Sequence, residues 1–249
     1  MSVFSKKKIK TIIRIVSVII MSVTIASLLP ACLSPDERET KARELLNEKY
    51  NREFEIVDVY RAGVSLSYFE AWAYDTGNPE ILFNVTVNNA DDNFSDTYVQ
   101  KCVCAKLSDA VAQKMDSFPG SYYVYSEAEG MQPYSDNPEI SINDYWALDK
   151  DNHFKIEIFT VPETEDPSLI YIGIQDILSD YPYIDAAVKL YVVSDAEMAE
   201  IQDYLETNDK MYMDYKEKTM HYFSVDLNVE NGLLTNDPNE FNSKVGAVL

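Results

Sequence analysis

The stretch Ile81-Leu82-Phe83-Asn84-Val85-Thr86-Val87-Asn88 decides how this sequence is interpreted. Apolar side chains occupy every second position from Ile81 to Val87, and the positions between them are mostly polar. Successive side chains of a β-strand point to opposite faces of the sheet. The alternation therefore predicts a strand with one buried face and one face turned toward solvent.

Further elements follow on both sides of this strand. Asp75-Thr76-Gly77-Asn78-Pro79 predicts a turn. Ser34-Pro35-Asp36-Glu37 predicts a helix start, with Ser34 as cap and Glu37 completing a capping box. The remaining expected elements are helices at 34–50, 95 or 96 to 118, 167–178 and from 194 onward, and strands at 53–60, 66–74, 122–125, 154–161, 186–193 and 220–229. Beyond Asn231 the sequence has no periodicity and predicts no element.

The order of these elements predicts an α+β protein with mostly antiparallel sheets and helices packed on one face. Residues 126–143 contain glycine and prolines among acidic residues and are the best internal boundary. We expect an N-terminal subdomain at 32–130, with the order α-β-β-β-α-β, and a C-terminal α+β subdomain at 131–249. Two small subdomains and one two-part domain both fit this pattern.

A helix followed by three antiparallel strands over residues 35–88 resembles the α-β-β-β unit of PepSY-type and cystatin-like extracytoplasmic modules. The resemblance covers about a fifth of the chain. It is carried by the order of the elements and by Lys41-Ala42-Arg43-Glu44-Leu45-Leu46. It implies a location outside the cytoplasm and no particular chemistry.

Residues 1–31 have the organisation of a secretory signal. Five basic residues precede an uncharged, mostly apolar run that ends in Leu29-Pro30-Ala31-Cys32. Residues 1–31 contain no acidic residue. This ending resembles the bacterial lipobox, which implies that Cys32 receives a diacylglycerol and becomes the first residue of the mature chain. Together with the acidic, tyrosine-rich body, it resembles uncharacterised surface lipoproteins of Gram-positive bacteria. The resemblance implies a lipid anchor on the extracytoplasmic face of the cell membrane.

Two other interpretations of this segment stay open. The uncharged run from residue 15 to residue 35 is long enough for an uncleaved transmembrane anchor. It also fits an ordinary secretory peptide in which Cys32 has no role. All three interpretations place the rest of the chain outside the cytoplasm, and the charges that flank the run agree.

The 249-residue chain has an ordinary globular composition and a formal net charge of −21. Removal of residues 1–31 leaves 16 basic residues against 42 acidic ones, a formal charge of −26. A protein-wide negative field repels phosphates, which excludes nucleic acid as a partner. The acidity indicates solubility or weak binding of divalent cations.

No motif in the sequence predicts a catalytic residue or a cofactor. Glycine-rich phosphate loops, a Gly-x-Ser-x-Gly elbow and, in the mature chain, a Ser-x-x-Lys pair are all missing. Cys102 and Cys104 lie two residues apart in an expected helix, where we expect them to be small packing residues. Carboxylate pairs abound among 42 acidic residues, so a glycosidase-type pair stays open as an alternative.

Two clusters could bind a ligand. Asp91, Asn93 and Asp96 offer oxygen ligands at short spacing and form a weak calcium candidate, although the pattern is not an EF-hand. We expect instead a solvated loop that caps the following helix.

The second cluster is aromatic. Tyr68, Trp72 and Tyr74 share one face of an expected strand, opposite Phe69 and two alanines. Since aromatic residues dominate sheet packing, we expect the aromatic face to be buried. The alternative is an exposed platform, with Glu70, for a sugar ring or a peptide.

These observations favour a lipid-anchored extracytoplasmic protein with a non-catalytic binding or interaction role. Its partners would be the membrane, through the anchor, and an envelope protein or peptidoglycan. The alternative is a cell-wall or carbohydrate-active hydrolase that uses a carboxylate pair. A solute-binding protein is less favoured, because such proteins usually have two lobes longer than this chain.

Overall fold

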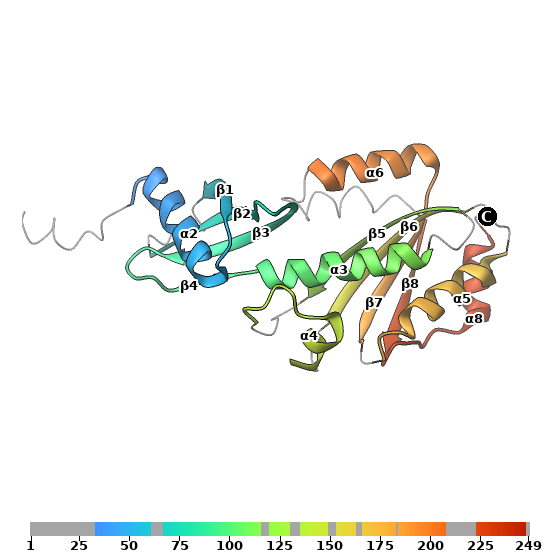
Figure 1. The fold of residues 1–249 in the computed structure, drawn as a ribbon. Helices are drawn as coiled ribbons and strands as arrows, with labels where there is room; N and C mark the ends of the chain where they lie inside the picture. Colours follow the sequence, from blue (N-terminus) through green and yellow to red (C-terminus); the bar gives the residue numbers. More distant parts are fainter. Residues whose placement is uncertain are drawn as a thin grey trace, which may run out of the picture.

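The computed structural model describes residues 33–60, 67–115, 120–129, 135–148, 153–162, 166–182, 184–207 and 223–247. Figure 1 shows two sheets at opposite ends of an elongated molecule, with helix α3 running between them. Both sheets are open and mostly antiparallel, which confirms the predicted α+β class. The expected signal segment at 1–31 and Cys32 lie outside the described residues.

The first sheet has the strand order β1-β2-β3-β4, with antiparallel neighbours throughout. Its strands are β1 (Phe54–Tyr60), β2 (Tyr68–Asp75), β3 (Asn78–Asn88) and β4 (Phe94–Asp96). The alternation of apolar and polar residues at 81–88 is present in β3, where Phe83, Val85 and Val87 are buried. The predicted strand is therefore confirmed, and its apolar face packs against helices.

Helix α2 (Pro35–Tyr50) covers the apolar face of this sheet. The predicted capping box is present: the Glu37 amide donates to Ser34 Oγ at 3.3 Å, and the Ser34 amide donates to Glu37 Oε2 at 2.7 Å. The helix ends at Asn51, which adopts the left-handed conformation that asparagine tolerates. Ala42 and Leu46 on its inner side are fully buried.

Helix α3 (Tyr98–Met115) belongs to both halves of the molecule. Tyr98 and Cys102 pack into the core of the first sheet, whereas Val103, Leu107 and the residues that follow pack against the second sheet. The helix starts later than the predicted residue 95 or 96, because Phe94–Asp96 pair with β3 as an edge strand. A continuous helix therefore links the two cores.

The second sheet has the strand order β5-β6-β7-β8-β9. Its strands are β5 (Gly120–Glu129), β6 (His153–Pro162), β7 (Ala186–Val192), β8 (Phe223–Glu230) and β9 (Leu233–Leu234). Strands β6 and β7 are parallel, and helix α5 (Pro167–Leu178) forms the crossover between them, whereas the other neighbours are antiparallel.

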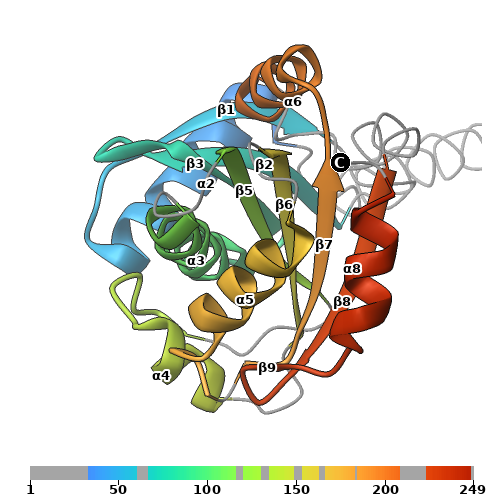
Figure 2. The same cartoon turned by 90° about the vertical axis from the view of Figure 1, so that its right-hand side faces the viewer.

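Both faces of the second sheet carry helices. Figure 2 shows α3, α5 and α8 (Pro238–Val245) along one face, with α6 (Asp195–Thr207) on the opposite side. The smaller core under α6 consists of Phe159, Tyr191, Val193, Met198 and Ile201. The expectation that helices pack on one face is therefore wrong for this sheet, because β6 and β7 present apolar side chains on both faces.

The structure changes the grouping of the strands. Strand β5 pairs along its whole length with β6, from Gly120 opposite Pro162 to Glu129 opposite His153. The boundary drawn between residues 130 and 131 separates β5 from the sheet to which it belongs. The change from the first sheet to the second falls along α3. The predicted boundary is misplaced because local sequence signals cannot show which distant strand a segment will pair with.

Two short helices are not predicted by the sequence. Helix α4 (Ile142–Leu148) begins at the end of the expected boundary segment, and it buries Tyr145 and Trp146. Helix α8 follows Asp237, whose side chain accepts a hydrogen bond from the Asn239 amide at 2.9 Å. Its eight residues bury only Phe241 and Val245, so its periodicity is too short to detect.

Candidate binding face

Strand β2 separates a buried face from a half-exposed one. Phe69, Ala71 and Ala73 are 0% exposed, whereas Tyr68, Glu70, Trp72 and Tyr74 are half-buried. The expectation that the aromatic face forms the core is wrong. The small alanines leave room for α2 to approach closely, so the larger aromatic side chains lie on the side that α2 does not cover.

The cross-strand register places further residues on this uncovered side. Trp72 lies opposite Asp58 of β1 and Asn84 of β3. A register shift between Ile56 and Asp58 leaves Val57 as the extra residue, 46% exposed. We call this surface the Trp72 face; it consists of Glu55, Asp58 and Tyr60 of β1, Tyr68, Glu70, Trp72 and Tyr74 of β2, and Leu82, Asn84 and Thr86 of β3.

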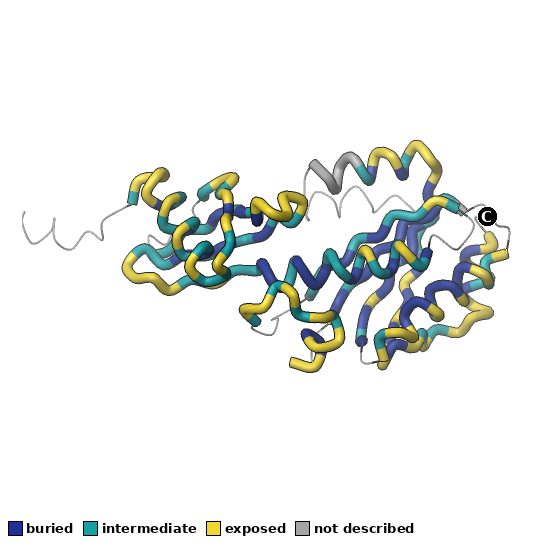
Figure 3. The backbone as a smooth tube through the Cα atoms, in the orientation of Figure 1, coloured by how far each residue is buried: buried dark blue, intermediate teal, exposed yellow. Residues whose placement is uncertain are grey.

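Figure 3 shows how differently the two halves are covered. The central strands β6 and β7 of the second sheet are mostly buried, whereas the strands of the first sheet alternate between buried and partly exposed residues. The helices that pack on the first sheet are α2 and the start of α3, and their buried residues lie on the opposite face from Trp72. Among the described residues, the Trp72 face carries no helix.

Tyrosine hydroxyls organise the polar groups of this face. Tyr74 donates a hydrogen bond to Glu55 Oε2, and Asn84 Nδ2 donates to the Tyr60 hydroxyl at 2.7 Å. Burial, followed by a hydrogen bond with Glu70, raises the pKa of Tyr60 to about 12. The hydrogen bond to Glu55 likewise raises the pKa of Tyr74. Both phenols therefore stay protonated at neutral pH and hold two carboxylates in place.

Trp72 and Asp58 are cross-strand neighbours that make fewer contacts than the two tyrosines. Within the described part of the chain, neither the Trp72 indole nor the Asp58 carboxylate has a hydrogen bond or ring contact. Large aromatic rings usually bury their surface or pair with another ring. A half-buried tryptophan beside a carboxylate without an ion pair is therefore available to a partner.

The end of the sheet is held by a buried carboxylate. Asp75 accepts hydrogen bonds from Tyr98 Oη at 2.6 Å, the Gly77 amide at 2.8 Å and Arg52 Nη1 at 2.9 Å. Burial alone would raise the pKa of Asp75, but these hydrogen bonds outweigh it and lower the pKa. Arg52 also donates to Glu139 Oε1 at 2.6 Å, which ties this end of the sheet to the segment before α4.

The structure does not bring the three calcium candidates together. The Asp96 carboxylate pairs with Lys49 at 2.8 Å and also accepts from Tyr50 and the Tyr98 amide, as a helix cap does. Asp91 turns back to accept from the Asn93 amide at 3.0 Å. No group of three ligand-type side chains among the described residues is arranged to hold a metal ion.

A lysine occupies the centre of that loop. Lys41 Nζ donates to the backbone oxygens of Asn88 at 3.1 Å and Asp91 at 2.6 Å, and lies 3.4 Å from Asp92 Oδ1. Lys41 belongs to α2, so this helix supplies the positive charge that binds the oxygen atoms of the loop. The loop therefore fastens α2 to the sheet.

Both cysteines of α3 are packing residues. Cys102 is buried in the core of the first sheet and Cys104 in the core of the second, because their side chains leave the helix in different directions. Burial raises the pKa of Cys102 to about 11. A thiol with that pKa is protonated at neutral pH and is a poor nucleophile.

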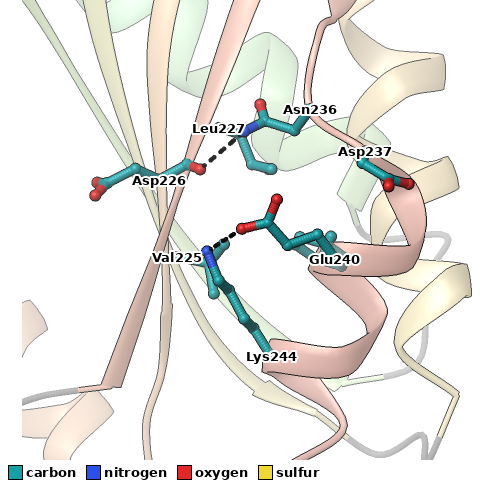
Figure 4. Close-up of a pocket in the computed structure, with 8 residues that line it drawn as sticks. Val225, Asp226, Leu227, Asn236, Asp237, Glu240 and Lys244 are labelled. Atoms are coloured by element: carbon teal, nitrogen blue, oxygen red, sulfur yellow. Dashed lines mark hydrogen bonds and ion pairs between the residues drawn. The ribbon is translucent and has the colours of Figure 1, made fainter.

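Figure 4 shows the residues that line a shallow pocket between β8 and α8. Its cavity volume is about 20 Å³. Its polar groups already have structural partners: Lys244 pairs with Glu240 at 2.7 Å, Asn236 donates to the Asp226 carbonyl at 3.4 Å, and Asp237 caps the helix. Small-molecule sites usually enclose about 300–1,000 Å³. The pocket therefore fits a helix-capping arrangement better than a ligand site.

No described helix combines the length and the apolar character needed to cross a membrane.

Comparison with known proteins gives one structural likeness. No family model matches the chain, and no curated protein matches it. The fold is similar to that of a DUF5037 family protein from Ruminococcus gnavus ATCC 29149, known from a crystal structure, with a TM-score of 0.60 and 13% identity. The match covers 83% of this chain and 98% of the other. At that identity, the likeness shows a related fold alone.

Proposed function

We propose that this chain is a lipid-anchored extracytoplasmic binding protein without catalytic activity, and that it binds its partner through the Trp72 face. The observation that carries the proposal is the position of Trp72, on the side of the first sheet that α2 leaves uncovered. Exposed aromatic surface rimmed by polar groups is typical of interaction sites. A partner on this face would be an envelope protein or peptidoglycan.

The anchor and the face belong to the same half of the molecule. Cys32 of the lipobox precedes the start of α2 at Pro35 by three residues, which span at most about 10 Å. Because α2 packs on the first sheet, a lipid on Cys32 would keep that sheet close to the membrane. One acyl chain binds a membrane only weakly, whereas two or more hold a protein firmly.

The carboxyl groups favour binding over hydrolysis. A glycosidase needs one carboxylic acid with a raised pKa to protonate the leaving oxygen. The described carboxyl groups with clearly shifted pKa values, Glu37, Asp75, Asp166 and Glu197, are all shifted downward, by hydrogen bonds at helix starts or, for Asp75, at the sheet end. Lowered values keep these groups ionised at neutral pH, so they act as structural acceptors.

Fractionation of cells that express the full chain tests the anchor. We expect Cys32→Ala to prevent lipid attachment, and mass spectrometry to find no acyl modification, whereas Cys102→Ala, a matched loss of a different cysteine, stays lipidated and membrane-bound. An unmodified wild-type chain would contradict the anchor.

Binding through the Trp72 face is tested separately, with isolated envelope material and the purified full chain. We expect Trp72→Leu to reduce retention on that material, and an exposed change on the second sheet, Asp226→Asn, to leave retention unchanged. Equal retention of all three chains would contradict the assignment of the face.

A further inference from the structure

We infer that the partner of the Trp72 face is an extended, lysine- or arginine-rich peptide segment, whose cationic side chains lie over the aromatic rings between the carboxylates. This inference rests on the proposed function and names the chemistry of the partner.

Charge is the first reason. The described residues of the Trp72 face include three carboxylates, on Glu55, Asp58 and Glu70, and no lysine or arginine. The chain without residues 1–31 carries a formal charge of −26, so the long-range field attracts cations to every part of the molecule. The face adds local selection to this attraction, because Asp58 has no described cation beside it.

The aromatic rings are the second reason. Cations lie favourably over the ring faces of aromatic residues, and tryptophan is the best of these. In this protein, Lys49 already lies 4.8 Å from the centre of the Tyr50 ring and 5.4 Å from that of Phe94. Trp72 offers the same kind of surface, with Asp58 next to it as a counter-ion.

The spacing of the side chains indicates an extended partner. Tyr68, Glu70, Trp72 and Tyr74 follow one another at every second residue of β2, about 7 Å apart. Alternate side chains of an extended peptide repeat at the same distance. A peptide that lies along β2 with basic residues at every second position can therefore place successive cations over successive groups of the face.

A second copy of this chain does not fit the same surface. Two Trp72 faces packed together would oppose carboxylates to carboxylates, and like charges at an interface cost binding free energy. A neutral glycan could stack on Trp72, but it would leave Asp58 without the cation that its charge favours. The charges therefore favour a basic peptide over either alternative.

The test measures binding of a fluorescent twelve-residue peptide, with lysine and serine in alternation, to the purified full chain at physiological ionic strength. We expect Trp72→Leu and Asp58→Asn each to weaken binding roughly three- to fivefold. Trp72→Phe keeps an aromatic ring and should stay within about twofold of the wild type. It also shows that the position tolerates substitution.

Asp226→Asn is the matched control for net charge, because Asp226 is an exposed aspartate on a strand of the second sheet. Equal loss of affinity in Asp226→Asn and Asp58→Asn would overturn the inference, since the peptide would then respond to total charge alone. Unchanged affinity in Trp72→Leu would overturn it as well.

A third arm separates this inference from the proposed function. Chitin oligosaccharides and a glutamate-serine peptide are tested for their ability to protect Trp72 from acrylamide quenching. Protection by the sugar without protection by the lysine peptide would overturn the basic partner and leave a binding face in place. Protection by the lysine peptide alone supports the inference, and no protection by any probe counts against both.

Discussion

The two sheets differ in what covers them. In the second sheet, β6 and β7 are buried from both sides: Ile158 and Leu190 face the core under α3 and α5, while Phe159 and Tyr191 face α6. In the first sheet, β2 buries one face and leaves the other half-exposed. A sheet that is covered on both sides stabilises the fold, whereas the side chains of an uncovered aromatic face can contact a partner.

Aromatic residues show the same contrast between covered and uncovered faces. Phe159 and Tyr191 stack with their ring centres 4.6 Å apart, and Trp146 stacks on Phe154 at 4.4 Å. Trp72 has no such ring contact among the described residues. Since paired, buried rings contribute most of the aromatic stabilisation, substitutions on the covered faces should affect unfolding far more than substitutions on the Trp72 face.

The largest expected effect lies in the second sheet. Phe159→Ala removes a fully buried ring that stacks on Tyr191, and it should lower the free energy of unfolding by about 4 kcal/mol. Urea denaturation of the full chain, followed by far-UV circular dichroism, measures this loss. A loss below about 1 kcal/mol would show that the α6 side of the sheet is not a packed core.

The buried carboxylate of the first sheet comes next. Asp75→Asn replaces a charge that accepts three hydrogen bonds and pairs with Arg52, and should cost about 3 kcal/mol at pH 7. Because the pKa of Asp75 is lowered in the folded protein, this stabilisation is present above its ordinary pKa and is lost as the pH falls through the lowered one. The difference between wild type and variant should therefore shrink between pH 7 and pH 3. A difference that stays constant over that range would contradict the ionised carboxylate.

The helix cap near the expected anchor should have a smaller effect. Ser34→Ala removes the side-chain acceptor of the Glu37 amide and should cost about 1 kcal/mol. Ser194→Ala, which removes the equivalent acceptor at α6, is the matched variant in the other half. Denaturation midpoints of both variants measure the effect, and an unchanged midpoint in each would mean that neither capping box contributes.

The smallest expected effect is at Trp72. Trp72→Leu exchanges one half-exposed apolar side chain for another and should change the free energy of unfolding by less than about 1 kcal/mol. Phe83→Leu, on the covered face of the neighbouring strand, should cost more, because its ring packs among Phe54 and Tyr98. If Trp72→Leu were the more damaging of the two in urea denaturation, the face would be part of the core.

Much of the local structure follows from short-range patterns. The alternation at 81–88, the turn at 75–79 and the capping boxes at Ser34 and Ser194 all predict elements that the structure contains. These signals arise from neighbouring residues, so they need no knowledge of the rest of the chain. The short helix α8, with two buried side chains, has too few apolar positions to give such a signal.

Long-range packing was not predictable in the same way. Tyr68, Trp72 and Tyr74 alternate with Phe69 and two alanines, and either face of such a strand can be core. The outcome depends on α2, whose Ala42 and Leu46 fit against the alanine side. The pairing of β5 with β6, and the parallel pairing of β6 with β7, depend equally on contacts between distant segments.

The most direct test of the account compares the two tryptophans by acrylamide quenching in the free, full-length protein. Trp146→Phe leaves Trp72 as the reporter, and Trp72→Phe leaves Trp146, which is 3% exposed. We predict that Trp72 is quenched readily and that Trp146 is strongly protected. Equal protection of Trp72 would mean that the face is covered, and would contradict its role as a binding surface.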